Sequence, residues 1–184
     1  MDKVHLKRTR RILDGHLWVF SIELYESPKK YAPGSIVEIC DMKDAFLGIG
    51  YINPQSLISV RILSKSKETI DRDFFKRRID EALNHRARFC GTRDAIRIVF
   101  SEGDFLPGLI VDRYKECLAA QFLTLGMDAM KDDIISLLDE IFKPETIVIR
   151  NDSRIRELEG LSLYKEIVNG SIEKLPVINE DGVL

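Results

Sequence analysis

The sequence predicts an α+β protein of two units, a small N-terminal all-β barrel or sandwich followed by an α+β domain of several strands on one or two helices. Two observations carry this prediction. Up to about Leu63, short apolar runs alternate with turn residues, whereas helical and strand-like runs alternate further on. A polar stretch at 64–71 separates the two patterns. We therefore expect domains spanning 1–68 and 69–184.

Four apolar runs predict the strands of the first unit, and turn residues such as Gly, Pro, Asp and Ser separate them. They are 18–20, 35–39, 45–52 and 56–63. In the last run Ile58, Val60 and Ile62 alternate with polar residues, which predicts a half-buried strand. We expect Trp18, a lone tryptophan within an apolar run, to pack in the barrel core.

The second unit begins with a predicted helix that Asp71 caps. Apolar residues recur at helical spacing from Arg72 to Cys90, and basic residues fill other positions. A second helix follows Gly126 and ends at Lys143-Pro144. The remaining runs predict five strands, at 95–100, 109–114, 117–125, 146–150 and 163–168, with a tight hairpin at 115–116.

Composition is that of an ordinary globular protein, with 45% hydrophobic and 32% charged residues among 184. No run approaches the ~18 apolar residues of a membrane span, and no signal peptide is evident, so we expect a cytoplasmic protein without a membrane partner. Cys40, Cys90 and Cys117 are odd in number and lack a C-x-x-C pair. They predict buried thiols rather than disulfides or a metal site.

The charge is uneven along the chain although the net charge is only -2. Residues 1–68 and 69–100 each carry three more Lys and Arg than Asp and Glu, whereas residues 101–184 carry eight fewer. If the protein binds a polyanion, the first hundred residues should supply the cations. Charge alone equally fits a solvated mixed surface.

The segment SEGDFLPGLIVDRY at 101–114 is the most informative loop. Pro107 and Gly108 suit the middle of a type II turn, so the simplest interpretation is a connection between two strands. Glu102 and Asp104 are close enough in sequence to act together, but we find no second set of partners for acid–base catalysis. The Gly48 and Gly50 pair is not followed by a helix, and it indicates close backbone approach in a strand rather than a nucleotide loop.

Two stretches resemble one known family. RRILDGHLWVFSIEL at 10–24 with 34–63 resembles the N-terminal PUA domain of the S-adenosylmethionine-dependent cytosine-C5 methyltransferases of large-subunit ribosomal RNA. Residues 101–134 begin with the segment at 101–114, which we call the acidic loop. Together with RNDSRIRELEGL at 150–161, they resemble the central domain of that family. The resemblance covers nearly the whole chain in the same order.

The resemblance implies a PUA-like β-barrel that engages RNA and a central α+β domain. In the family, a domain that binds S-adenosylmethionine follows, and this sequence stops before it at EKLPVINEDGVL. We therefore expect no cofactor site and no catalytic residue in this chain, which would be inactive alone. The implied partners are ribosomal RNA and the S-adenosylmethionine-binding domain, and the chain would be a fragment or a shortened protein.

Clustered basic residues are candidate RNA contacts, and for the arginines near the N-terminus the resemblance favours this interpretation over a solvated surface, which remains the alternative for Lys29 and Lys30. The candidates are Lys7, Arg8, Arg10 and Arg11, then Lys29 and Lys30, then Arg77 and Arg86, with Lys76 and Arg88 beside them on the basic helix. For the helix the alternative is pairing with acids one turn away, such as Asp73 with Arg77. Glu102 and Asp104 are candidates for orienting the RNA or the following domain.

Three functions stay open from the sequence. The chain is the RNA-recognition portion of a methyltransferase, a stand-alone noncatalytic RNA-binding or adaptor protein, or, with least support, a small-molecule enzyme at the acidic loop. The DNA immediately downstream of Leu184 separates the first two, because a coding frame for a glycine-rich cofactor fold favours the first and a stop codon favours the second.

Overall fold

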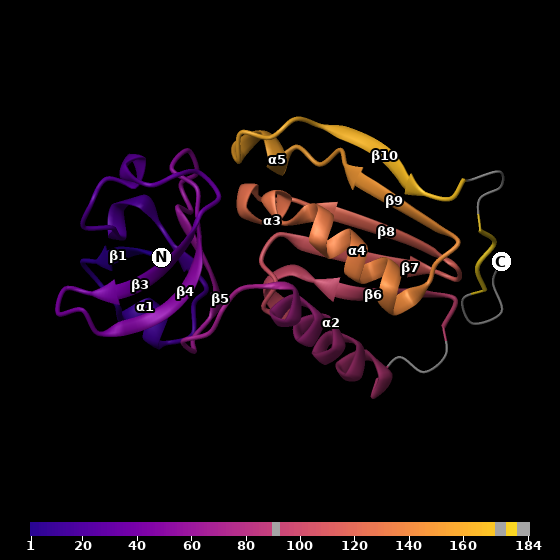
Figure 1. Ribbon diagram of the computed structural model, residues 1–184, viewed down its shortest axis with the longest axis horizontal. Coiled ribbons are helices and arrows are strands. Elements are labelled where there is room, and N and C mark those ends of the chain that lie inside the picture. The colour runs from indigo at the N-terminus through magenta and orange to yellow at the C-terminus, as the bar shows by residue number, and fades with distance from the viewer. Residues whose placement is uncertain (90–92, 172–175, 180–184) are drawn as a thin grey trace.

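The structure, a computed structural model, describes residues 1–89, 93–171 and 176–179. Two five-stranded mixed sheets, each with its own hydrophobic cluster, lie side by side (Figure 1). Helices accompany both sheets, and the prediction of an α+β fold is confirmed. Cys90 lies outside the described residues.

The first sheet is curled, with strand order β1-β3-β4-β5-β2. Its strands are β1 (Asp2–Leu6), β2 (Trp18–Val19), β3 (Ile36–Asp41), β4 (Phe46–Ile52) and β5 (Val60–Ser64). β1 runs parallel to β3, and the other pairs are antiparallel. The short helix α1 (Arg10–Leu13) and the 3-10 turns η1 (Ser21–Glu23) and η2 (Pro28–Lys30) connect the strands. Val4, Val37 and Ile39 are among the residues of its core.

Two features of the first sheet differ from the sequence prediction. β1 and α1 were not predicted, because neither short segment shows a long apolar period. β5 begins at Val60 rather than at 56, and its alternation is not half-buried, since Ser59 and Arg61 are buried as well. The polar face of β5 is covered by the second unit, which a period-2 pattern does not reveal.

The predicted close approach at Gly48 and Gly50 is confirmed. A β-carbon added at Gly50 would lie 2.2 Å from the backbone oxygen of Arg61, and one at Gly48 would lie 2.9 Å from that of Ser64. Both glycines therefore allow β4 to pack tightly against β5.

The second sheet has the order β10-β9-β8-β7-β6. Its strands are β6 (Ala95–Phe100), β7 (Leu109–Tyr114), β8 (Cys117–Phe122), β9 (Thr146–Asn151) and β10 (Tyr164–Asn169). Only β8 and β9 are parallel, and α3 (Leu125–Ala129) and α4 (Lys131–Phe142) make the crossover between them. Figure 1 shows α4 lying across this sheet and α2 (Arg72–Ala87) beside β6. α5 (Ile155–Leu158) precedes β10.

Most local predictions for the second unit are confirmed. Asp71 accepts a hydrogen bond from the backbone N–H of Phe74 and so caps α2. Leu109 donates to the carbonyl of Leu106 across the Pro107-Gly108 turn, where Gly108 has φ +82°. The second helix is divided into α3 and α4, and it ends at Lys143 in the left-handed region, just before Pro144.

Candidate nucleic-acid interface

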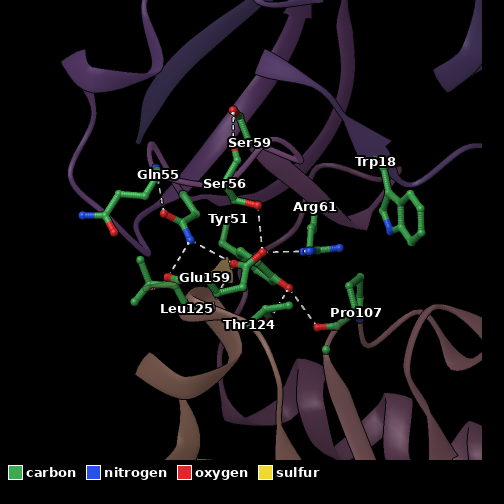
Figure 2. Close-up of polar contacts among 12 residues, drawn as sticks. Trp18, Tyr51, Gln55, Ser56, Ser59, Arg61, Pro107, Thr124, Leu125 and Glu159 are labelled. Atoms are coloured by element: carbon green, nitrogen blue, oxygen red, sulfur yellow. Dashed lines mark hydrogen bonds and ion pairs between the residues drawn. The ribbon is translucent and has the colours of Figure 1, made fainter. Parts of the chain in front are cut away.

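A buried carboxylate joins the two units. The side chain of Glu159 is only 2% exposed and lies after α5, yet most of its partners belong to the first unit (Figure 2). Its Oε1 accepts hydrogen bonds from Arg61 Nη2 at 2.9 Å and from Ser56 Oγ at 2.8 Å. Its Oε2 accepts from Asn53 Nδ2 at 2.9 Å and from the Leu125 backbone N–H at 3.4 Å.

These contacts keep Glu159 ionised. Burial by itself would raise the pKa of Glu159, but the hydrogen bonds from Asn53 and Arg61 outweigh it, and the pKa lies below the ordinary 4.5. A carboxylate and a guanidinium buried together are costly to separate. The cluster therefore fixes β5 of the first unit against the α3 and α5 region of the second.

Tyr51 forms the apolar part of the same junction. Its hydroxyl donates to the carbonyl of Pro107 at 2.9 Å and lies 2.7 Å from Thr124 Oγ1 (Figure 2). A β-carbon at Gly126 would lie 2.1 Å from Tyr51 Cγ, so only glycine allows this ring to pack on α3. Tyr51 and Leu63 of the first unit thus belong to the hydrophobic cluster of the second.

Glu102, from the acidic loop, also contacts the first unit. The indole N–H of Trp18 donates to Glu102 Oε1 at 2.8 Å, and Arg61 Nη1 lies 3.5 Å from the same oxygen. The expectation that Trp18 packs in the barrel core is wrong. The residue is 37% exposed, because its polar edge binds a loop of the other unit.

Asp104 faces the opposite way, toward α2. Both of its carboxylate oxygens accept hydrogen bonds from the guanidinium of Arg86, and one also accepts from the backbone N–H of Phe100. The two acids therefore bind different cations and do not form a carboxylate pair. This arrangement gives no support to acid–base chemistry at the loop, and it leaves Arg86 committed to an internal ion pair.

The structure brings four of the predicted RNA-binding residues together. Lys7, Arg8, Arg10 and Arg11 line one cavity of about 600 Å³, which we call the front cavity. Phe20 and the 83%-exposed Ile22 supply its apolar wall.

Two of these four cations are paired within the first unit. Arg10 bonds Asp14 at 2.9 Å, and Arg11 bonds Glu23 at 3.2 Å while stacking 4.9 Å from the Phe20 ring. Lys7 and Arg8 are exposed, and among the described residues no acid pairs with them. They are the cations of the front cavity most available to an anion.

The other predicted cations lie elsewhere. Lys29 and Lys30 are exposed on η2 and do not line the front cavity. Lys76 pairs with Glu140 of α4, and Arg77 pairs with Glu68, so the pairs one turn apart, which were the alternative to RNA contact, do not form for either residue. Arg88 is exposed at the end of α2.

Sequence reasoning missed the residues that build the junction. Glu159 lies 106 positions from Asn53 and 98 positions from Arg61 in the chain, and their pairing has no local signal. It also missed Arg78, which lines one cavity between the units and a neighbouring cavity within the second unit. A basic residue inside an apolar strand, as Arg61 is, was the one available hint.

The βα turn after β8 does not fit S-adenosylmethionine. A nucleotide-like cofactor would approach the first backbone N–H groups of the following helix. Here Leu125 N–H bonds Glu159, and the Tyr51 ring fills the space over Gly126.

Among the residues that the structure describes, no group of three His, Cys, Asp or Glu side chains is suited to a metal ion. Within the same residues, no helix is long and apolar enough to cross a membrane.

The chain is similar to known proteins along most of its length. A family model described as a PUA-like domain matches residues 3–65. Ribosomal RNA large subunit methyltransferase I of Shewanella amazonensis is 35% identical over 172 residues, which are 91% of this chain and 43% of that protein. The protein of the same name from Pseudoalteromonas atlantica is 30% identical over 183 residues, which are 98% of this chain and 46% of that protein.

Two solved structures share the fold. A putative SAM-dependent methyltransferase from Streptococcus mutans superposes with a TM-score of 0.79 at 17% identity, over 100% of this chain and 47% of that one. SMU.776, a putative methyltransferase complexed with SAH, gives 0.81 at 17% identity with the same coverage. The chain spans less than half the length of the curated relatives that it matches. By sequence, it carries a PUA-like domain and is homologous to ribosomal RNA large subunit methyltransferase I.

Proposed function

We propose that this chain binds ribosomal RNA and positions it for a SAM-dependent cytosine-C5 methyltransferase domain that these residues do not supply. Residues 1–68 act as the RNA-binding unit, and residues 69–184 act as the central unit that holds it in place. The chain binds and positions the RNA in the cytoplasm. The similarity to ribosomal RNA large subunit methyltransferase I supports the choice of RNA.

The front cavity is the single observation that carries this proposal. It combines the exposed cations Lys7 and Arg8 with the Phe20 ring, within the residues that match a PUA-like domain. Cations bind phosphates, and an accessible aromatic ring stacks on an unpaired base. A cavity with both features suits RNA better than a small acidic metabolite.

The Cys40 thiol gives no support for methyl transfer. Addition to the cytosine ring needs a thiolate. Burial raises the pKa of the Cys40 thiol, which disfavours that form. The role that we propose for this chain is recognition and orientation.

The test is the affinity of the 184-residue chain for large-subunit ribosomal RNA fragments over a range of salt concentrations. The logarithm of the association constant should fall linearly with the logarithm of salt. The double variant Lys7→Ala/Arg8→Ala should bind more weakly and should reduce the steepness of that slope by about 1–2.

A matched control removes two cations at the far hairpin of the second sheet. Arg113→Ala/Lys115→Ala changes the net charge equally but should leave affinity and slope close to those of the wild type. Equal losses of RNA affinity in the two double variants would mean that the front cavity is not the RNA-binding site. If the wild type binds no RNA at low salt, the proposed function is refuted.

A further inference from the structure

A groove with aromatic walls lies along α2, where its larger cavity is lined by the second unit alone and its smaller cavity by both units. It consists of two neighbouring cavities, of about 590 and 410 Å³, that share Arg78 and Phe105. Clefts of roughly 300–1,000 Å³ are typical of ligand sites. We call the two together the junction groove.

Three exposed phenylalanines line the larger cavity of the groove. Phe89, Phe100 and Phe105 are 74%, 52% and 47% exposed, although Phe74 and Phe75 of the same region are buried. The helical spacing of α2 predicted an apolar face that included Phe89, and the structure instead leaves this ring in solvent. Aromatic surface that gathers around one cavity indicates a binding site.

The acidic loop holds Phe105 in place at a cost to the backbone. Phe105 has φ +57° and Ser101 has φ +47°, which non-glycine residues adopt rarely. Hydrogen bonds offset the cost, since Phe105 N–H donates to the Glu102 carbonyl and Gly108 N–H donates to Ser101 Oγ. Strained residues that their surroundings fix so firmly are typical of ligand sites.

Each exposed ring carries a basic partner. The guanidinium of Arg78 lies 5.2 Å from the Phe105 ring, and that of Arg97 lies 5.2 Å from the Phe100 ring. The imidazole of His85 lies 5.2 Å from the Phe89 ring. Alternating rings and guanidinium groups are the surfaces on which nucleobases stack.

Basic residues extend from the junction groove toward the front cavity. Lys65 lines the smaller cavity, and its ammonium bonds the carbonyl of Ile12 in α1, the helix that carries Arg10 and Arg11. Among the described residues no acid pairs with Lys65 at one end of the groove or with Arg88, next to Phe89, at the other. The acids in the wall are neutralised, Glu68 by Arg77, Glu81 by Arg78 and Asp104 by Arg86.

We propose that the junction groove binds an unpaired segment of RNA, with bases stacked on Phe100, Phe105 and Phe89 and phosphates near Lys65 and Arg88 at its two ends. The basic path from the front cavity favours a nucleic acid strand over an apolar peptide. The inference rests on the proposed function for the choice of RNA, and it adds a second site that reads unpaired bases.

The test compares two single-stranded oligoribonucleotides of roughly 12 residues, one with bases and one abasic, at a fixed low salt concentration. The wild type should prefer the base-bearing strand, and Phe100→Leu/Phe89→Leu should reduce that preference roughly tenfold, as loss of stacking predicts. Both rings are exposed, so these changes should not impair folding. Phe100→Tyr should retain the preference, because the aromatic ring is kept.

The two proposals fail in different ways. Lys7→Ala/Arg8→Ala should weaken binding of the base-bearing and the abasic oligoribonucleotide by the same factor. It should leave the preference for the base-bearing strand intact. If the double Leu variant keeps the wild-type preference, or if an uncharged apolar peptide competes for the groove better than the RNA does, the groove is not a base-stacking site. Failure of the wild type to bind either strand would instead refute the proposed function itself.

Discussion

Glu159 shows at the scale of single residues how the two units are held together. Its carboxylate gathers a guanidinium, a hydroxyl and an amide from the first unit. These contacts of Glu159 were not predictable from the sequence, because Arg61 lies 98 positions away. Its local pattern indicates only the polar face of a strand. Trp18 was mispredicted for the same reason, since its partner Glu102 is 84 positions away.

Glu159→Gln should destabilise the protein by about 3–5 kcal/mol, because it leaves the Arg61 guanidinium buried without its counter-charge. Chemical denaturation at neutral pH measures this loss. The matched control is Glu157→Gln, an exposed residue of α5 that should change stability by less than about 0.5 kcal/mol.

The same variant has a pH signature. The pKa of Glu159 is lowered in the folded protein, so its stabilisation is complete above the unfolded value of 4.5 and is lost as pH falls through the folded value. The difference in unfolding free energy between wild type and Glu159→Gln should therefore narrow below pH 4.5. A difference that stays constant through this range would contradict the role of the ionised carboxylate.

The acidic loop is the informative element. The sequence predicted its turn correctly from Pro107 and Gly108, together with the strands on either side, because those signals are local. It could not predict that Glu102 and Asp104 point to different units, since side-chain direction here depends on Ser101 and Phe105 in left-handed conformations. The loop is thus both a turn and a spacer that positions Phe105.

Asp104→Asn should loosen the loop from α2. The amide side chain can still accept a hydrogen bond from the Phe100 N–H. It lacks the negative charge of the carboxylate, which accepts hydrogen bonds from both Nη1 and Nη2 of Arg86. We expect a loss of about 1.5–3 kcal/mol in unfolding free energy. We also expect faster hydrogen exchange at the backbone N–H groups of residues 105 and 106.

Asp80→Asn is the control for this change. It removes one carboxylate from the exposed face of α2, and both stability and loop exchange should match those of the wild type. Loop exchange at the wild-type rate in Asp104→Asn would show that the Arg86 pair does not hold the loop.

At the scale of the whole molecule, the order of most strands and helices followed from the sequence, although β1, α1 and α5 were not predicted, and the way the units meet did not follow. Apolar periodicity located the second sheet and its helices. The junction arises from the Tyr51 ring over Gly126 and from the Glu159 cluster, which are contacts between distant segments. The smaller cavity of the junction groove is lined by residues of both units and so depends on this arrangement, whereas the charge pattern showed merely that the front of the chain is basic.

The most direct test of the account is to map where RNA touches the protein. Ultraviolet cross-linking of the chain to large-subunit ribosomal RNA, followed by mass spectrometry, should give adducts at Phe20 of the front cavity and at Phe89, Phe100 and Phe105 of the junction groove. Adducts confined to β9 and β10, with none at those four rings, would contradict the central claim that RNA lies along the basic path between the two units.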